Sequence, residues 1–163
     1  MPMDHVVVRS LEHLTGEAGK PALGFAVETR DRPGPAYKEG SSPDDVVWVQ
    51  LDGGLLVAKA RIRIGWVGEY ASVDEVRART AGSALHDLDA FWRGRPRYGY
   101  ASVASLQHEA WLEDPFWAGP RSYGYEWILL ENEKKRSSWL DPKPPPRGGE
   151  GLRGRFEAWL DSH

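Results

Sequence analysis

The sequence predicts an α+β fold: a small, mixed, mostly antiparallel β-barrel with one broken helix inserted midway and a helical tail at the C-terminus. The main observation is a pair of apolar, β-branched-rich runs, Val46–Leu51 and Leu55–Ile64, on either side of an Asp-Gly-Gly sequence. Such glycines supply the positive φ angles that tight hairpin turns need. Similar short runs recur along the chain, while helical patterns are few. Strands joined by hairpins therefore dominate, and a partly open barrel is favoured over a flat sheet.

Four further segments have the alternating or apolar composition of strands. They are His5–Ser10, Phe25–Arg30, Arg97–Leu106 and Tyr123–Glu131. Three segments do not fit this pattern. Asp31–Asp45 contains three prolines and is expected to be a loop. Trp66–Tyr70 should be an irregular or bulged extension of the hairpin. His108–Gly119 is expected to form a helical turn followed by a loop.

Helix signals lie mainly in the middle of the chain. Ser72 and Glu75 form a capping box, which predicts a helix from Val73 to about Thr80. A Gly-Ser pair then interrupts the pattern, and a second amphipathic segment is expected over Ala84–Arg93. A further brief helix is expected within Leu11–Lys20.

The C-terminal part of the chain differs in composition from the predicted barrel domain. Residues 1–141 form the predicted barrel domain, residues 142–150 a proline-rich, semi-rigid spacer, and residues 151–163 an amphipathic helix. Such a tail either docks on the body of the protein or binds a partner. The partner could be a second copy of the chain, which would give a homodimer.

Composition limits the function classes. The chain has 163 residues, 28% of them charged and 40% hydrophobic, as expected of one soluble globular domain. Its net charge is −3, so nucleic-acid affinity requires a local basic patch. The absence of cysteine excludes disulfides, cysteine-based zinc sites and thiol catalysis. The start of the chain does not resemble a signal peptide and no apolar run is long enough to cross a bilayer, so we expect a cytoplasmic protein.

Motifs for cofactors and metals are missing from the sequence. It contains neither a phosphate-binding P-loop nor a Gly-x-Gly-x-x-Gly sequence, and its five histidines do not have the paired spacing of metal ligands. We therefore expect no cofactor and no metal site.

The second run of the hairpin places basic residues on one face of a strand. Leu56, Ala58, Ala60, Ile62 and Ile64 should face the core, and the opposite face should carry Val57, Lys59, Arg61 and Arg63. Successive cations would lie about 6 to 7 Å apart. Such a face is either an ordinary solvated surface or a surface that binds a phosphate backbone.

Aromatic residues supply the second candidate feature. Arg97–Tyr100 (RYGY) and Arg121–Tyr125 (RSYGY) each place a basic residue close to two tyrosines around a glycine. Tyrosine rings with adjacent arginine suit base stacking and phosphate contact, although tyrosines that pack the barrel ends would give the same pattern. Eight tryptophans also raise the expectation of a ligand pocket, with Trp48, Trp66 and Trp111 as candidates by residue type.

The hairpin resembles the core of PUA-like domains, the superfamily that holds the ASCH, EVE and YTH modules. Those families carry a "Gly-Asp-x-Val-x-hydrophobic…Gly-x-Ile-x-Gly/Ala-x-Ala-x-Val" stretch just before an inserted helix. The residues that match are Asp45, Val47, Gly54, Val57, Ala58 and Ala60. The resemblance extends in strand order from Val46 to Ile128. It implies a small mixed β-barrel that binds RNA or DNA, often with a single base in a pocket between barrel and helix.

One departure from the ASCH pattern concerns catalysis. ASCH domains have a Gly-x-Lys-x-x-Glu-x-Arg motif, of which Glu28 and Arg30 match the end, but Leu23 and Phe25 occupy the glycine and lysine positions. The branches that act as amidohydrolases or ribonucleases rely on such a lysine, so the resemblance does not imply their activity here.

We therefore expect a non-catalytic nucleic-acid-binding module, with RNA favoured over DNA and an ordinary or modified base held by aromatic stacking. The residues expected to contact nucleic acid are Lys59, Arg61, Arg63 and Arg97 for phosphates, and Trp48, Trp66, Tyr98 and Tyr100 for the base. An alternative is an ASCH-like nucleoside or RNA hydrolase that uses a buried Lys59 near Glu28 or Glu69. Another is a protein-interaction or self-associating module that uses Pro142–His163.

Overall fold

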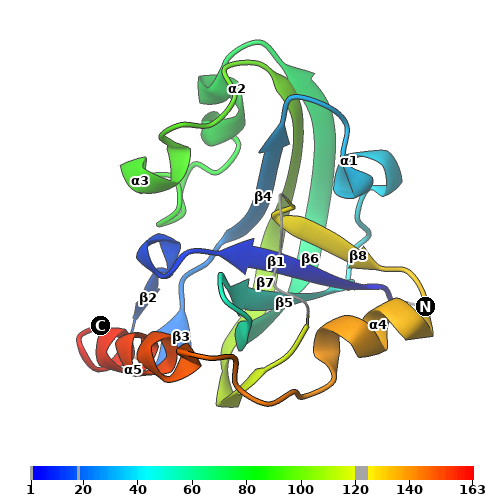
Figure 1. Cartoon of the computed structure of the whole chain (residues 1–163). Helices are drawn as coiled ribbons and strands as arrows, with labels where there is room; N and C mark the ends of the chain where they lie inside the picture. The colour runs from blue at the N-terminus through cyan, green and yellow to red at the C-terminus, as the bar shows by residue number, and fades with distance from the viewer. Residues whose placement is uncertain (1, 18, 120–124) are drawn as a thin grey trace.

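The computed structural model, which describes residues 2–17, 19–119 and 125–163, contains a six-stranded mixed sheet curled into a half-barrel (Figure 1). The strand order is β4-β7-β6-β5-β1-β8. Only β1 and β5 run parallel; the other neighbours are antiparallel. The strands are β1 (Asp4–Arg9), β4 (Phe25–Arg30), β5 (Val46–Leu51), β6 (Leu55–Tyr70), β7 (Gly99–Trp117) and β8 (Trp127–Leu130), and β2 (Gly16–Glu17) pairs with β3 (Lys20–Pro21) separately. The predicted α+β fold with a mixed, mostly antiparallel sheet is confirmed.

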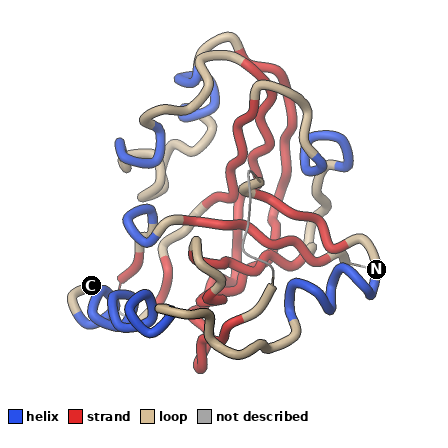
Figure 2. Tube along the Cα trace, viewed as in Figure 1, coloured by secondary structure: helices blue, strands red, loops and turns tan. Residues whose placement is uncertain are grey.

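Short helices surround this sheet (Figure 2). They are η1 (Leu11–His13), α1 (Pro35–Glu39), α2 (Val73–Ala78), α3 (Asp89–Trp92), α4 (Glu133–Leu140) and α5 (Gly149–Asp161). The Ser72 side chain accepts a hydrogen bond from the Asp74 backbone N–H, so the predicted N-cap of α2 is confirmed. The second helix was predicted over Ala84–Arg93. The structure has turns in the first part of this segment and a helix only in α3.

Local structure differs in detail from the prediction in three places. His108–Gly119 is not a helical turn and loop but part of β7 as far as Trp117, because pairing with β6 holds it extended. The helix expected within Leu11–Lys20 is limited to the single turn η1, after which the β2–β3 hairpin begins. The Asp31–Asp45 loop contains α1, which starts with a proline at its first helical position.

The two faces of the sheet are covered by different helices. On one face, Phe156 of α5 is 1% exposed and packs with Val49, Leu51 and Leu55. On the other, Leu140 of α4 packs in the cluster that also contains Val6, Leu56, Ile128 and Leu130. The C-terminal helix therefore docks on the body of the protein. Self-association through the tail stays a prediction.

A buried polar triad lies between β1, the start of β5 and β8. The Trp127 indole N–H donates to Nδ1 of His5 over 2.9 Å, so the proton of the neutral imidazole is on Nε2, which donates to Asp45 over 2.8 Å. Burial lowers the pKa of His5 and keeps the ring neutral. Burial alone would raise the pKa of Asp45, but hydrogen bonds from the Met3 and Ser42 N–H groups and from His5 outweigh it, and the pKa is lowered. This triad fixes β1 against β5.

Candidate nucleic-acid interface

The three predicted cations of β6, here called the basic strand (Lys59, Arg61 and Arg63), lie at the protein surface. Lys59 and Arg63 are exposed and Arg61 is half-buried. Within the described residues, none of the three has a carboxylate within ion-pair distance. Arg61 donates a hydrogen bond from Nη1 to the Asp44 carbonyl oxygen over 2.9 Å. The charges of the basic strand are therefore available to a ligand.

Trp48 and Lys59 are brought together by the β5–β6 pairing. The two residues are direct partners in the register, and Nζ of Lys59 lies 4.7 Å from the centre of the Trp48 ring. This is cation–π distance. The Trp48 indole nitrogen is buried and has no hydrogen-bond partner in the described part of the chain. Trp48 thus contacts the basic strand at Lys59 through a cation–π interaction.

Bulges in β6 and β7 change the face on which several residues lie. Arg63 is the extra residue between the Ile62–Leu106 and Ile64–Ser105 pairs, and Val57 is the extra residue opposite Val49 and Gln50. An extra residue inverts the alternation that follows it. Two predictions are therefore wrong: Ile64 is 60% exposed rather than in the core, and Val57 is fully buried rather than beside the cations.

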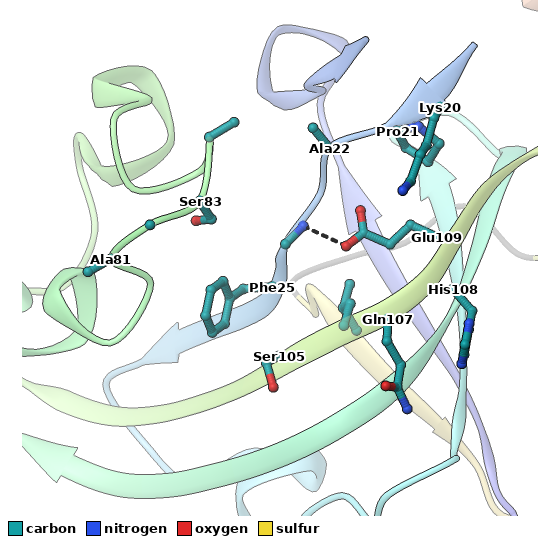
Figure 3. Close-up of a pocket in the computed structure, with 14 residues that line it drawn as sticks. Lys20, Pro21, Ala22, Phe25, Ala81, Ser83, Ser105, Gln107, His108 and Glu109 are labelled. Atoms are coloured by element: carbon teal, nitrogen blue, oxygen red, sulfur yellow. Dashed lines mark hydrogen bonds between the residues drawn. The ribbon is translucent and has the colours of Figure 1, made fainter. Parts of the chain in front are cut away.

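A cavity of about 700 Å³ lies beside the part of β7 that pairs with the basic strand. Figure 3 shows it bounded by the start of β4 at Phe25, the segment after α2 at Ser83, and β7. From β7 come Ser105, Gln107, His108 and Glu109. We call this space the large cavity. It holds polar groups that donate and accept hydrogen bonds, and among its lining residues only Phe25 and His108 carry aromatic rings.

The wall of the large cavity is shaped by a β7 bulge. Lys59 pairs with Ala110 and Arg61 with Gln107, which leaves one more residue on β7 than on β6. His108, within this bulge, has a positive φ of 56°. The carboxylate of Glu109 turns toward the chain entering β4 and accepts hydrogen bonds from the Leu23 and Gly24 N–H groups, over 2.7 and 3.1 Å. The bulge thus fixes both β7 and the entry to β4 around the large cavity.

The remaining predicted site residues lie toward the other end of β6. Glu69 pairs with Tyr100, ten positions from Lys59, which is roughly 30 Å along a strand. The Tyr100 ring contacts Tyr37 edge-on, Tyr98 is 73% exposed, and Arg97 is exposed. Trp66 lies under Arg79, whose guanidinium carbon is 3.5 Å from the ring centre. The structure therefore does not gather Trp48, Trp66, Tyr98 and Tyr100 around one pocket.

Of the second tyrosine element, Arg121–Tyr125, the structure describes Tyr125. Residues 121–124 of the RSYGY sequence lie outside the described residues. Tyr125 is described, and the Arg30 guanidinium lies 4.3 Å from the centre of its ring.

The requirements of the hydrolase alternative are not met at Lys59. Its side chain is exposed above Trp48 rather than buried. Glu28 is 2% exposed on β4, which β7 separates from β6 in the sheet. Burial raises the pKa of Glu28 to about 7, against the effect of hydrogen bonds from the Glu126 and Trp127 N–H groups.

Sequence reasoning missed two residues of interest: the buried Arg9 and the largely buried Arg95. Their surroundings come from β1, η1, the turn after β5, α3 and the residues just before β8, so no local motif in the sequence marks them. Over the described ranges, no group of three or more potential metal ligands is found. No helix in the described part of the chain is long and apolar enough to span a bilayer.

Comparisons with known proteins give distant structural matches only. No protein-family model matches the sequence, and no curated protein sequence matches it significantly. Among solved structures, the N-terminal domain of Staphylothermus marinus McrB matches with a TM-score of 0.41 and 11% identity, over 69% of this chain and 75% of that one. The ASCH protein of Zymomonas mobilis matches with a TM-score of 0.40 and 12% identity, over 88% and 83%. A point mutant of that ASCH protein gives the same TM-score and identity, over 88% and 84%.

Proposed function

We propose that this chain is a non-catalytic nucleic-acid-binding module, with RNA preferred over DNA, in which backbone phosphates lie along the basic strand and a base enters the large cavity. The observation that carries the proposal is the pairing of Arg61 with Gln107. Opposite residues of an antiparallel pair project to the same face of a sheet. A cation without a carboxylate partner therefore stands beside a residue that lines the large cavity.

The electrostatics favour a local interface. The whole chain has a net charge of −3, so it does not attract polyanions by its overall charge. Lys59, Arg61 and Arg63 are not neutralised by ion pairs with carboxylates of the described chain, and each phosphate that they contact would release counterions. Trp48, whose ring lies under Lys59, adds an aromatic side chain at the edge of this surface, against which a base can stack.

The chemistry of the large cavity favours recognition of a base by its edges. The Gln107 amide both donates and accepts hydrogen bonds, whereas the Ser83 hydroxyl already donates to the Thr80 carbonyl oxygen and offers a base only an acceptor. Phe25 supplies one ring. A base in this space would be held by hydrogen bonds and by stacking on Phe25 or His108, in place of the four-ring pocket expected from the sequence.

The test is a binding titration with matched charge reversals. A fluorescein-labelled single-stranded RNA, the same sequence as DNA, and a duplex are titrated by fluorescence anisotropy against the wild type and the Lys59→Glu/Arg61→Glu/Arg63→Glu variant. The control variant is Lys134→Glu/Arg147→Glu/Arg155→Glu, which reverses three exposed cations on α4, in the spacer and on α5. Both variants change the net charge by the same amount.

We expect the basic-strand variant to lose at least about tenfold in affinity, because charge-assisted hydrogen bonds to phosphates are removed. The control variant should retain wild-type affinity within a few-fold. Equal losses in the two variants would show that only the net charge matters, and wild-type binding by the basic-strand variant would refute the interface.

A further inference from the structure

Arg9, at the end of β1, is a buried cation without a described counter-ion. The residue is 4% exposed, and its Nη2 donates to the Phe25 carbonyl oxygen. Its Nη1 is buried and has no hydrogen-bond partner, and the residue makes no ion pair, within the described chain. Buried charges in proteins are normally paired, because desolvation is costly. Burial, with the nearby Arg95, lowers the pKa of Arg9 to about 10, so the guanidinium is still charged at neutral pH.

Two nearby carboxylates, Glu109 and Glu126, act on the charge of Arg9, but neither forms an ion pair with it in the described chain, and Glu109 already accepts hydrogen bonds from the Leu23 and Gly24 N–H groups. Glu126 is paired with Arg95, whose Nη1 lies 2.6 Å from the Glu126 carboxylate. Arg95 also lies 3.9 Å from the centre of the Phe91 ring, while Arg9 faces the same ring at 5.8 Å. Asp52 lines the adjoining cavity from an exposed turn and makes no ion pair with Arg9. Two guanidinium groups therefore converge around Phe91, and the one carboxylate in an ion pair there, Glu126, is paired with Arg95.

A cavity of about 310 Å³ opens beside this pair. We call it the arginine cavity; its lining includes Arg9, Ser10, His13, Phe91, Arg95 and Glu126. The His13 ring contacts Phe91 edge-on, with 5.5 Å between ring centres. The volume is at the lower end of the range for small-molecule sites and exceeds the room that a bare ion needs.

We propose that the arginine cavity binds a terminal phosphate monoester, carried by a free nucleotide or by the end of a nucleic-acid strand. Arg9 is the counter-ion, and the Ser10 hydroxyl and the His13 imidazole are further donors. Guanidinium groups match phosphate oxygens in geometry and charge, and a phosphate monoester presents three terminal oxygens to such a set, where a carboxylate presents two. Binding of a phosphate at the end of a nucleic-acid strand rests on the proposed function, whereas binding of a free nucleotide does not.

Thermal unfolding and calorimetric titration of the full chain test the site with defined probes. The probes are AMP, adenosine, inorganic phosphate, and one RNA sequence with either a 5′-phosphate or a 5′-hydroxyl. A free-nucleotide site predicts that AMP raises the melting temperature by about 5–10 °C at a hundredfold excess over its Kd, while adenosine has no effect. A strand-end site predicts at least about tenfold tighter binding of the 5′-phosphorylated RNA than of the 5′-hydroxyl RNA.

Variants connect the effect to the cavity. Arg9→Met removes the buried charge and should lower phosphate-dependent binding at least about tenfold. Because a core substitution can impair folding, His13→Ala and Ser10→Ala are measured as well, and each should lower the same binding by roughly threefold or more. His163→Ala, at the exposed C-terminus, is the control and should leave it unchanged.

The proposal is overturned if AMP and adenosine behave alike and the 5′-phosphate does not affect RNA binding. It is also overturned if phosphate-dependent binding is unchanged from wild type in both the His13→Ala and the Ser10→Ala variants. The Lys59→Glu/Arg61→Glu/Arg63→Glu variant separates this site from the proposed function. If that variant keeps AMP binding, the arginine cavity stands whatever becomes of strand binding; if AMP binding disappears with the basic strand, the phosphate binds there instead.

Discussion

Replacement of Glu28 by glutamine should stabilise the protein at neutral and alkaline pH and have little effect in acid. Glu28 is 2% exposed, and Oε2 accepts hydrogen bonds from the Glu126 and Trp127 N–H groups over 3.0 and 3.1 Å. Burial raises the pKa of Glu28 to about 7 from an ordinary value of 4.5. The carboxyl group is therefore protonated in the folded protein over a range in which it is ionised in the unfolded chain.

The direction of this pH dependence follows from the coupling between proton binding and folding. A raised pKa means that the folded state binds the proton more tightly, so the stabilisation is complete below pH 4.5 and is lost as the pH rises to about 7. A difference of two to three pKa units corresponds to about 3 kcal/mol at roughly 1.4 kcal/mol per unit. Glutamine is neutral at every pH and keeps an oxygen that accepts both N–H groups. The Glu28→Gln variant should therefore gain about 3 kcal/mol over the wild type by pH 8.

The assay is urea unfolding at pH 5 and pH 8, followed by tryptophan fluorescence. Glu113→Gln, at an exposed position in the irregular part of β7, is the control and should leave the difference between the two pH values unchanged. If the free-energy difference between Glu28→Gln and wild type is the same at both pH values, or if the variant is the less stable protein at pH 8, the burial of a protonated Glu28 is refuted.

Three further substitutions test the fold and the large cavity. His5→Ala should lower the free energy of unfolding by about 3 kcal/mol, because it leaves the Trp127 N–H and the Asp45 carboxylate without their buried partner; urea unfolding measures it. Phe156→Ala should cost about 3–5 kcal/mol and detach α5, visible as lost helical circular dichroism, and a loss below 1 kcal/mol would mean that the helix is not held by this side chain. Gln107→Ala should weaken RNA binding roughly threefold to tenfold without a change in its salt dependence, because it removes a base contact and no phosphate contact; a changed salt dependence would place Gln107 on the backbone instead.

Local signals in the sequence located much of the fold. Val46–Leu51 and Phe25–Arg30 are strands with the predicted bounds, because their composition and flanking turns already exclude a helix. The capping box at Ser72 also predicted the start of α2. These features depend on residues close to one another in the chain, which is why they can be read from one sequence.

Features that depend on distant strands could not be predicted in this way. The extension of β7 through His108–Gly119 follows from pairing with β6, and the exposure of Ile64 follows from the bulge at Arg63. The charges at 59, 61 and 63 were visible in the sequence, but their proximity to the large cavity depends on the β6–β7 register. The arginine cavity had no sequence signal, because segments far apart in the chain form it together: β1, η1, the turn after β5, α3 and the residues just before β8.

The salt dependence of RNA binding tests the central claim most directly. If Lys59, Arg61 and Arg63 each contact a phosphate, they contribute a slope of about −2 to a plot of log K against log salt concentration for a single strand. The wild type and the Lys134→Glu/Arg147→Glu/Arg155→Glu control should both show this contribution, and the Lys59→Glu/Arg61→Glu/Arg63→Glu variant should lose it. Identical slopes for the wild type and the basic-strand variant would contradict the account.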